Sequence, residues 1–223
     1  MFQRHNRVWL TTAGWKLACA TALAAHVKEL TRWAENDWPA IIRRSESALS
    51  PNILCLGLAA PPDPHTGMKT RIPFLVSTEH IVRHDVPLAI ISAEKALPAA
   101  WQKDFAELAE KVTNSGLEFR VYGSAAMQAI TGLSYLTPAS DIDLLFYPQT
   151  KGQLLAGVAL LTSYATKLPL DGEIVFPSGR AVAWKEWVQA ANNPAQPRVL
   201  AKGTFTLALA SVADLCAELE SPS

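Results

Sequence analysis

The stretch LEFRVYGSAAMQAITGLSYLTPASDIDLLFYP, residues 117–148, decides how this chain folds. Apolar and charged residues alternate from 117 to 121, which is typical of a half-buried strand, and this strand ends at Gly123. Segment 124–130 has the composition of a short helix, and an apolar strand follows Asp141. The stretch therefore predicts a strand, a Gly-Ser turn, a short helix, a loop and a strand that opens with two carboxylates.

The Gly-Ser turn is a candidate phosphate site. Gly123 and Ser124 stand at the start of the predicted helix. The first backbone amides of a helix have no partner within it and lie at the positive end of the helix dipole, so they bind phosphate readily. We therefore expect Gly123 and Ser124 to hold the phosphates of a substrate.

The two carboxylates of the second strand are candidate metal ligands. Asp141 and Asp143 stand two residues apart, so both side chains point to the same face of a strand. Carboxylates this close repel each other unless a cation lies between them. Mg²⁺ (or Mn²⁺), which prefers oxygen ligands and substrate phosphates, suits the pair and indicates metal-assisted phosphoryl or nucleotidyl transfer. The alternative is that both aspartates are solvated at the start of the strand.

The whole motif, GSxxxQxxTGLxYLxxxSDIDLL, resembles the nucleotidyltransferase superfamily. It is more closely similar to the malonate decarboxylase holo-acyl-carrier-protein synthases, also called phosphoribosyl-dephospho-CoA transferases. The interval between Ser124 and Asp141 is longer than in most of the superfamily and fits this narrower family. Weaker likenesses at RHNRVWL (4–10), WPAIIRR (38–44) and DGEIVFPSG (171–179) extend the resemblance over most of the chain.

The resemblance implies an enzyme that acts on a carrier protein. Such an enzyme moves a phosphoribosyl-dephospho-CoA group from 2′-(5″-triphosphoribosyl)-3′-dephospho-CoA to a serine of the acyl carrier protein subunit of malonate decarboxylase, and it releases diphosphate. Two alternatives remain open. One is a nucleotidyltransferase that acts on another protein or a small molecule. The other is a non-catalytic nucleotide-binding protein of the same fold, against which the intact Gly-Ser and D-x-D motifs weigh.

Asp171 and Glu173 are the candidates for a third carboxylate. In the superfamily that this chain resembles, such a group comes from the strand beside the D-x-D strand, where it aids metal binding or deprotonates the attacking hydroxyl. Residues two apart share one strand face, so either side chain is able to reach the site. Glu173 is favoured as catalytic because it lies inside the predicted strand. Asp171, expected to contact the substrate, precedes Gly172 and is also typical of a turn, and a polar hairpin edge is the alternative for both.

Basic residues elsewhere are candidates for binding the donor's phosphates. Arg43 and Arg44 follow a short strand predicted at 40–42. Guanidinium groups bind phosphate oxygens in pairs, so we expect both arginines to contact the triphosphate. The same two arginines, together with Arg71 or Lys185, are expected to balance the charge on the leaving diphosphate. The alternative for the arginines is a solvated pair on a loop.

Composition excludes several classes of protein. The 223 residues carry a formal net charge of zero, which argues against a nucleic-acid-binding surface. The three cysteines form neither a metal-binding spacing nor a disulfide framework, so a cytoplasmic enzyme is expected. No segment is typical of a membrane span, and Lys16 interrupts the only stretch that resembles an export signal. His80 and His84 have helical metal-ligand spacing but no third ligand nearby, and we interpret them as surface histidines.

The chain as a whole predicts an α+β protein. Residues 1–90 are expected to form a small N-terminal α/β module, with a helix over 17–35 and a hairpin of strands 53–58 and 72–76. Residues 91–223 are expected to form the catalytic domain, a nucleotidyltransferase-like mixed sheet with flanking helices. Its further predicted elements are helices at 100–112 and 151–165, a hairpin at 171–184, a short strand at 198–201 and a last helix at 207–219.

Overall fold

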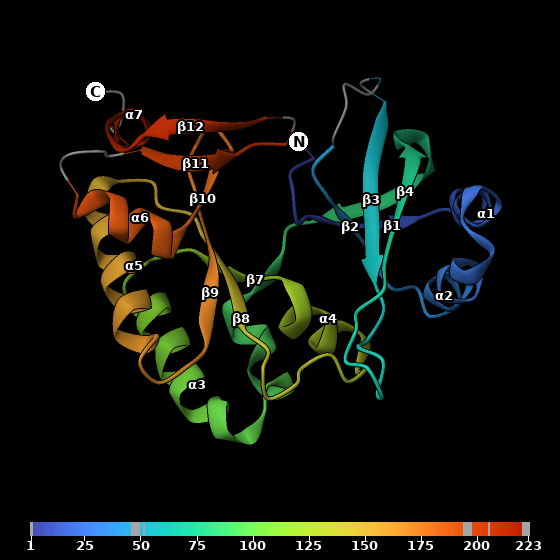
Figure 1. Ribbon diagram of the computed structural model, residues 1–223, viewed down its shortest axis with the longest axis horizontal. Coiled ribbons are helices and arrows are strands. Elements are labelled where there is room, and N and C mark those ends of the chain that lie inside the picture. The colour runs from blue at the N-terminus through green and yellow to red at the C-terminus, as the bar shows by residue number, and fades with distance from the viewer. Residues whose placement is uncertain (1, 46–49, 51, 194–197, 205, 220–223) are drawn as a thin grey trace. The chain divides into compact units, whose positions relative to one another are not determined.

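The computed structural model describes residues 2–45, 50, 52–193, 198–204 and 206–219. The chain divides into two compact units, Met1–Pro87 and Leu88–Ser223, and each is built around its own sheet (Figure 1). Helices and both parallel and antiparallel strand pairs are present, which confirms the α+β class.

Unit 1 is an antiparallel sheet of five strands with two helices, and its strand order is β4-β3-β2-β1-β5. Its elements are β1 (Arg7–Leu10), α1 (Thr12–Thr21), α2 (Ala24–Glu35), β2 (Ala40–Ile42), β3 (Ile53–Ala59), β4 (Arg71–Ser77), η1 (Thr78–His80) and β5 (Ile81–Asp85). The short strand predicted at 40–42 and the hairpin of β3 and β4 are confirmed. His80 ends η1 and His84 lies in β5, so the two histidines do not share a helix turn.

The single helix predicted over 17–35 is wrong. Ala22 and Leu23 are extended, with ψ angles of 159° and 142°, so α1 ends and α2 begins there. A single amphipathic helix over 17–35 would place Leu17 and Leu23 on its apolar side, but these side chains are 51% and 70% exposed. Each helix instead buries a tryptophan of its own, Trp15 in α1 and Trp33 in α2.

Unit 2 is a mixed sheet of seven strands in the order β12-β11-β10-β9-β8-β7-β6. Its elements are β6 (Leu88–Ala89), η2 (Ile90–Ala96), α3 (Ala99–Asn114), β7 (Phe119–Val121), α4 (Gly123–Thr131), β8 (Ile142–Phe146), α5 (Lys151–Tyr164), β9 (Leu170–Val175), β10 (Ala181–Ala183), α6 (Trp184–Ala191), β11 (Arg198–Lys202), β12 (Leu207–Ser211) and α7 (Val212–Ala217). Among the described strands of this unit, only β8 and β9 pair in parallel, and the crossover helix α5 connects them. The remaining pairs are antiparallel.

Helices α3, α5 and α6 lie along one side of this sheet (Figure 1). Their apolar side chains, among them Phe105, Leu161 and Trp187, join one core with Ile142 and Ile174 of the sheet. The helices predicted at 100–112 and 151–165, the hairpin of β9 and β10 and the strand β11 are confirmed. The core covers this face of the sheet, so polar side chains that alternate with the core residues lie on the other face.

The last helix predicted, 207–219, is wrong in its first part. Residues 207–211 form β12, which pairs with β11 from Leu207 opposite Lys202 to Ser211 opposite Arg198. Helix α7 begins only at Val212, after Ser211 caps it by accepting a hydrogen bond from the Asp214 amide. Among the described residues, no helix combines the length and the apolar character that a membrane span requires.

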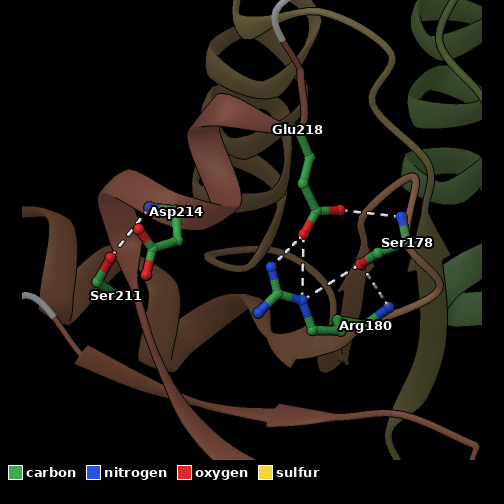
Figure 2. Close-up of polar contacts among 5 residues, drawn as sticks. All are labelled: Ser178, Arg180, Ser211, Asp214 and Glu218. Atoms are coloured by element: carbon green, nitrogen blue, oxygen red, sulfur yellow. Dashed lines mark hydrogen bonds and ion pairs between the residues drawn. The ribbon is translucent and has the colours of Figure 1, made fainter.

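The turn between β9 and β10 is tied to the end of α7 by a partly buried charge cluster. Glu218 accepts hydrogen bonds from the Ser178 amide at 2.9 Å and from the Arg180 guanidinium (Figure 2). Burial alone raises the pKa of Glu218, but these hydrogen bonds outweigh it and hold the pKa below its ordinary value. The cluster therefore stabilises the fold only while Glu218 is ionised.

This cluster predicts a pH-dependent contribution to stability. Because the pKa of Glu218 is lower in the folded state, its contribution is complete above the ordinary glutamate pKa and is lost as pH falls through the folded value. We expect Glu218→Gln to lower the free energy of unfolding by about 1.5–3 kcal/mol at neutral pH, the usual range for hydrogen bonds to a charged group. Urea unfolding of both proteins at pH 7 and pH 3 measures this; a difference that is equal at both pH values contradicts the assignment.

Candidate active site

The Gly-Ser turn lies directly against the D-x-D strand. The Tyr122 amide donates to the Asp143 carbonyl at 3.1 Å, and α4 begins at the next residue. Gly123 has a φ of +65°, a backbone conformation that residues with a Cβ atom rarely adopt. A Cβ on Gly123 would lie 2.2 Å from the Asp143 Oδ2 atom. The start of α4, including the partly buried Ser124, therefore approaches the Asp143 carboxylate as only glycine permits.

Strand register brings a second aspartate beside Asp143. In the parallel pair of β8 and β9, Asp143 lies opposite Asp171 and Leu145 lies opposite Glu173. Neighbouring strands are about 4.8 Å apart, so Asp143 and Asp171 are adjacent on the face that the core helices leave uncovered. Asp141 lies immediately before β8 and is exposed. The site thus has Asp143 and Asp171 at its centre and Asp141 at the entrance of the strand.

Asp171 and Gly172 lie inside β9, so they do not form a turn. Strand β9 lies between β8 and β10, so its carboxylates are not on an edge of the sheet either. Gly172 has a φ of +133°, and a Cβ there would lie 1.8 Å from the Leu144 carbonyl oxygen. The absence of a side chain lets β9 approach β8 closely. Gly172 therefore maintains the strand pairing that places Asp171 beside Asp143.

Each carboxylate of β9 is paired with a lysine. Lys185 of α6 lies 3.4 Å from Asp171, and about half of each side chain is exposed. Lys202 of β11 lies 2.9 Å from Glu173, whose side chain is only 6% exposed. The buried Glu173 is thus held by a partly exposed lysine, whereas Asp171 is accessible from solvent. Lys202 was not among the residues expected in the site, although its spacing from Arg198 places both on the same face of β11.

The loop between α4 and β8 is organised by Gln128. Its side-chain oxygen accepts hydrogen bonds from the amides of Tyr135 and Leu136 at 2.8 and 3.0 Å. Its Nε2 atom donates to the Ala96 carbonyl. Ser140, the residue before Asp141, is buried and accepts from the Thr137 amide at 2.9 Å. The glutamine of the sequence motif therefore acts on the backbone that leads into the D-x-D strand.

The two arginines predicted to bind phosphate belong to unit 1. Arg43 directly follows β2, is exposed, and its amide donates to the Cys55 carbonyl at 3.0 Å. Its Cδ atom lies close to Gly57 of β3. Arg44 is partly buried, and Arg71 is exposed at the start of β4. Their assignment to the donor's phosphates stays a prediction.

The aspartates around Asp143 suit a cation whose coordination shell is completed by the phosphates of its substrate. Within the described ranges, no three histidine, cysteine or acidic side chains converge as a preformed metal centre. Mg²⁺ commonly uses only one or two carboxylates and takes its other ligands from phosphates and water. Asp143 with its neighbours Asp141 and Asp171 satisfies that requirement, and the start of α4 lies beside them.

Comparison with known proteins identifies the family. Models of the N-terminal and C-terminal domains of the phosphoribosyl-dephospho-CoA transferase MdcG match residues 3–87 and 88–213. A phosphoribosyl-dephospho-CoA transferase of Xanthomonas campestris pv. campestris (strain 8004) is 35% identical over 196 residues, which are 86% of this chain and 89% of that protein. The same-named protein of Bradyrhizobium diazoefficiens is 34% identical over 187 residues, or 82% and 80% of the two chains.

No solved structure matches this chain. The match of both domain models nevertheless covers nearly every residue of the two units. The resemblance drawn from the Gly-Ser and D-x-D motifs is confirmed. The chain belongs to the phosphoribosyl-dephospho-CoA transferase family, and it is a transferase.

Proposed function

We propose that the protein transfers a phosphoribosyl-dephospho-CoA group from 2′-(5″-triphosphoribosyl)-3′-dephospho-CoA to a serine of the malonate decarboxylase acyl carrier protein. The observation that carries this proposal is the register of Asp143 with Asp171 beside the left-handed Gly123. Carboxylates next to a helix start suit chemistry on phosphates. Membership of the family supports a donor derived from CoA.

The proposed transfer forms one bond and breaks another. The serine oxygen bonds to the α-phosphorus of the donor, the bond from that phosphorus to the bridging oxygen breaks, and diphosphate leaves. Amides at Gly123 and Ser124 hold the departing phosphates. Asp171, accessible and next to Asp143, accepts the proton of the serine hydroxyl and passes it to water.

Asp141 and Asp143 are the residues that would hold Mg²⁺ (or Mn²⁺) against the donor. When bound, the cation would neutralise phosphate charge and make the α-phosphorus more electrophilic. The protein itself contributes orientation: Gly123 keeps the helix start against Asp143, and Gln128 orders the loop that leads to Asp141. Lys185, which already lies beside Asp171, is available to the leaving diphosphate.

The geometry changes which carboxylate of β9 we assign to catalysis. Glu173 pairs with Leu145, two residues beyond Asp143 along β8, and its carboxylate forms an ion pair with Lys202. We expect Asp171→Asn to reduce turnover by at least tenfold more than Glu173→Gln, because only Asp171 neighbours Asp143 on an accessible surface. Steady-state rates of the two variants decide between them, and a larger loss in Glu173→Gln would restore Glu173 as the third carboxylate.

Arg43 and Arg44 provide a separate prediction about the donor. A charge-assisted bond to phosphate contributes about 1.5–3 kcal/mol, so replacing either arginine with alanine should weaken donor binding on the order of tenfold or more. Lysine should restore only part of the affinity, since it cannot make the paired contact. Calorimetry with the donor, and with dephospho-CoA as the control that lacks the triphosphate, measures this. Unchanged donor affinity would assign both arginines to a solvated surface.

Diphosphate release tests the proposed reaction. The protein, the donor and Mg²⁺ are incubated with apo carrier protein, and diphosphate is measured over time. We expect release that depends on the carrier and stops once the carrier is fully modified. Release at the same rate without carrier would indicate hydrolysis or transfer to another acceptor and would contradict the proposed acceptor.

A further inference from the structure

The outer face of the hairpin formed by β11 and β12 exposes large apolar side chains. Leu207 and Leu209 of β12 are 50% and 64% exposed. Leu207 pairs with Lys202 and Leu209 pairs with Leu200, and directly paired residues of antiparallel strands project to the same face. Together with Arg198, these four residues form what we call the hairpin face. Contiguous exposed apolar patches with a polar rim mark protein-binding surfaces.

The hairpin face is continuous with the carboxylate site. Lys202 pairs with Ala181, and Ala181 pairs with Val175, which lies two residues after Glu173 on the same face of β9. The ion pair of 2.9 Å between Lys202 and Glu173 joins the two regions directly. Three strand spacings separate β11 from β8, or roughly 14 Å. A protein bound on the hairpin face thus has the carboxylates within its footprint.

The opposite face of the sheet is not open to an acceptor. Helices α3, α5 and α6 cover it (Figure 1), and their apolar side chains belong to the core on that face. Among the described residues of unit 2, two further large apolar side chains are exposed, Ile91 in η2 and Leu155 in α5, and neither belongs to a strand of the sheet. An acceptor serine that reaches Asp143 and Asp171 has to approach over the face that carries Leu207 and Leu209.

Charge on the hairpin face favours an acidic partner. The described residues of the hairpin, 198–204 and 206–211, include Arg198 and Lys202 but no aspartate or glutamate. Glu173 compensates the charge of Lys202, whereas Arg198 is exposed at the start of β11, opposite Ser211 in the pairing. An apolar centre with an exposed arginine at its edge complements a protein that presents apolar side chains within an acidic surface.

We propose that the hairpin face docks the acceptor carrier protein, an acidic protein whose serine is thereby presented to Asp143 and Asp171. This inference rests on the proposed function, because it assumes a protein acceptor. A second copy of this chain, paired through the edge strand β12, is the competing occupant, and the experiment separates the two.

The test uses Leu209→Asp and Arg198→Glu in the full chain. Lys202 is left unchanged because it pairs with Glu173. Leu155→Asp is the matched control, since Leu155 is 73% exposed on α5 and lies outside the sheet. For each protein we would measure the KM for apo carrier at saturating donor, the donor Kd by calorimetry, and the mass in solution by analytical ultracentrifugation.

We expect both hairpin variants to raise the carrier KM at least tenfold, with the donor Kd within twofold of wild type and no change in Leu155→Asp. An unchanged carrier KM in both hairpin variants overturns the docking proposal, as does a change in mass that accounts for the effect. If wild-type protein leaves the carrier unmodified, the proposed function itself fails, and docking fails with it. Active wild type with unaffected hairpin variants defeats docking alone.

Discussion

Asp143→Asn should abolish transfer and leave the fold intact. The substitution keeps the size of the side chain and removes the charge beside Gly123 and Asp171. A metal-held phosphate site contributes several kcal/mol to transition-state stabilisation, and each 1.4 kcal/mol is tenfold in rate, so we expect a loss of about 10³-fold. Turnover is measured with saturating donor and carrier, and circular dichroism is recorded on the same sample.

Asp214→Asn is the control for this change, because Asp214 is exposed in α7 and takes no part in the proposed site. It should retain wild-type turnover. Turnover within a factor of two of wild type in Asp143→Asn would remove Asp143 from the chemistry, whatever the control does.

Gly123→Val should nearly eliminate donor binding. A valine at a φ of +65° is strained by about 1–3 kcal/mol, and its Cβ would collide with the Asp143 carboxylate. Either the start of α4 or the Asp143 side chain has to move, so the amides and the carboxylate no longer face the same phosphates. We expect the donor Kd to rise on the order of a hundredfold, measured by calorimetry in the presence of Mg²⁺.

The same helix offers a matched control for that variant. Gly132, the C-cap of α4, has a φ of +70°, and nothing lies within 4 Å of a Cβ placed there. Gly132→Val therefore has the same backbone strain without the contact to Asp143. Donor affinity should survive in Gly132→Val and be lost in Gly123→Val; equal losses would attribute the effect to helix strain and not to a phosphate site.

Local signals in the sequence were sufficient for the central motif. The alternation at 117–121, the glycine at 123 and the apolar run after Asp141 each indicate one element, and the structure has β7, α4 and β8 there. These signals agree with the structure because the apolar residues of the short helix and of the two flanking strands are the ones that are buried.

The helices predicted over 17–35 and 207–219 were placed incorrectly. A short apolar run does not distinguish the 3.6-residue period of a helix from the two-residue period of a strand. The run LALAS at 207–211 fits either a helix or a strand, and its pairing with β11 makes it β12. Neither proline nor glycine marks the break at Ala22 and Leu23, so nothing in the local sequence indicates that α1 ends there.

The position of Asp171 beside Asp143 depends on the register of the two strands, and the alternation of apolar and polar residues does not determine register. A strand pattern shows that Asp171 and Glu173 share a face, but only the pairing of β8 with β9 shows that Asp171 is the neighbour of Asp143. The ion pair of Glu173 with Lys202 joins residues 29 positions apart through the intervening strand β10. Such a contact depends on the assembled sheet and has no local signal.

The intact mass of the carrier protein shows directly whether the group is transferred to the acceptor serine. Apo carrier is incubated with the donor, Mg²⁺ and the protein, and its mass is measured before and after, with a carrier whose acceptor serine is alanine as the control. We predict one added phosphoribosyl-dephospho-CoA group on wild-type carrier, none on the alanine carrier and none with Asp143→Asn protein. An unmodified wild-type carrier, or equal modification of the alanine carrier, would contradict it.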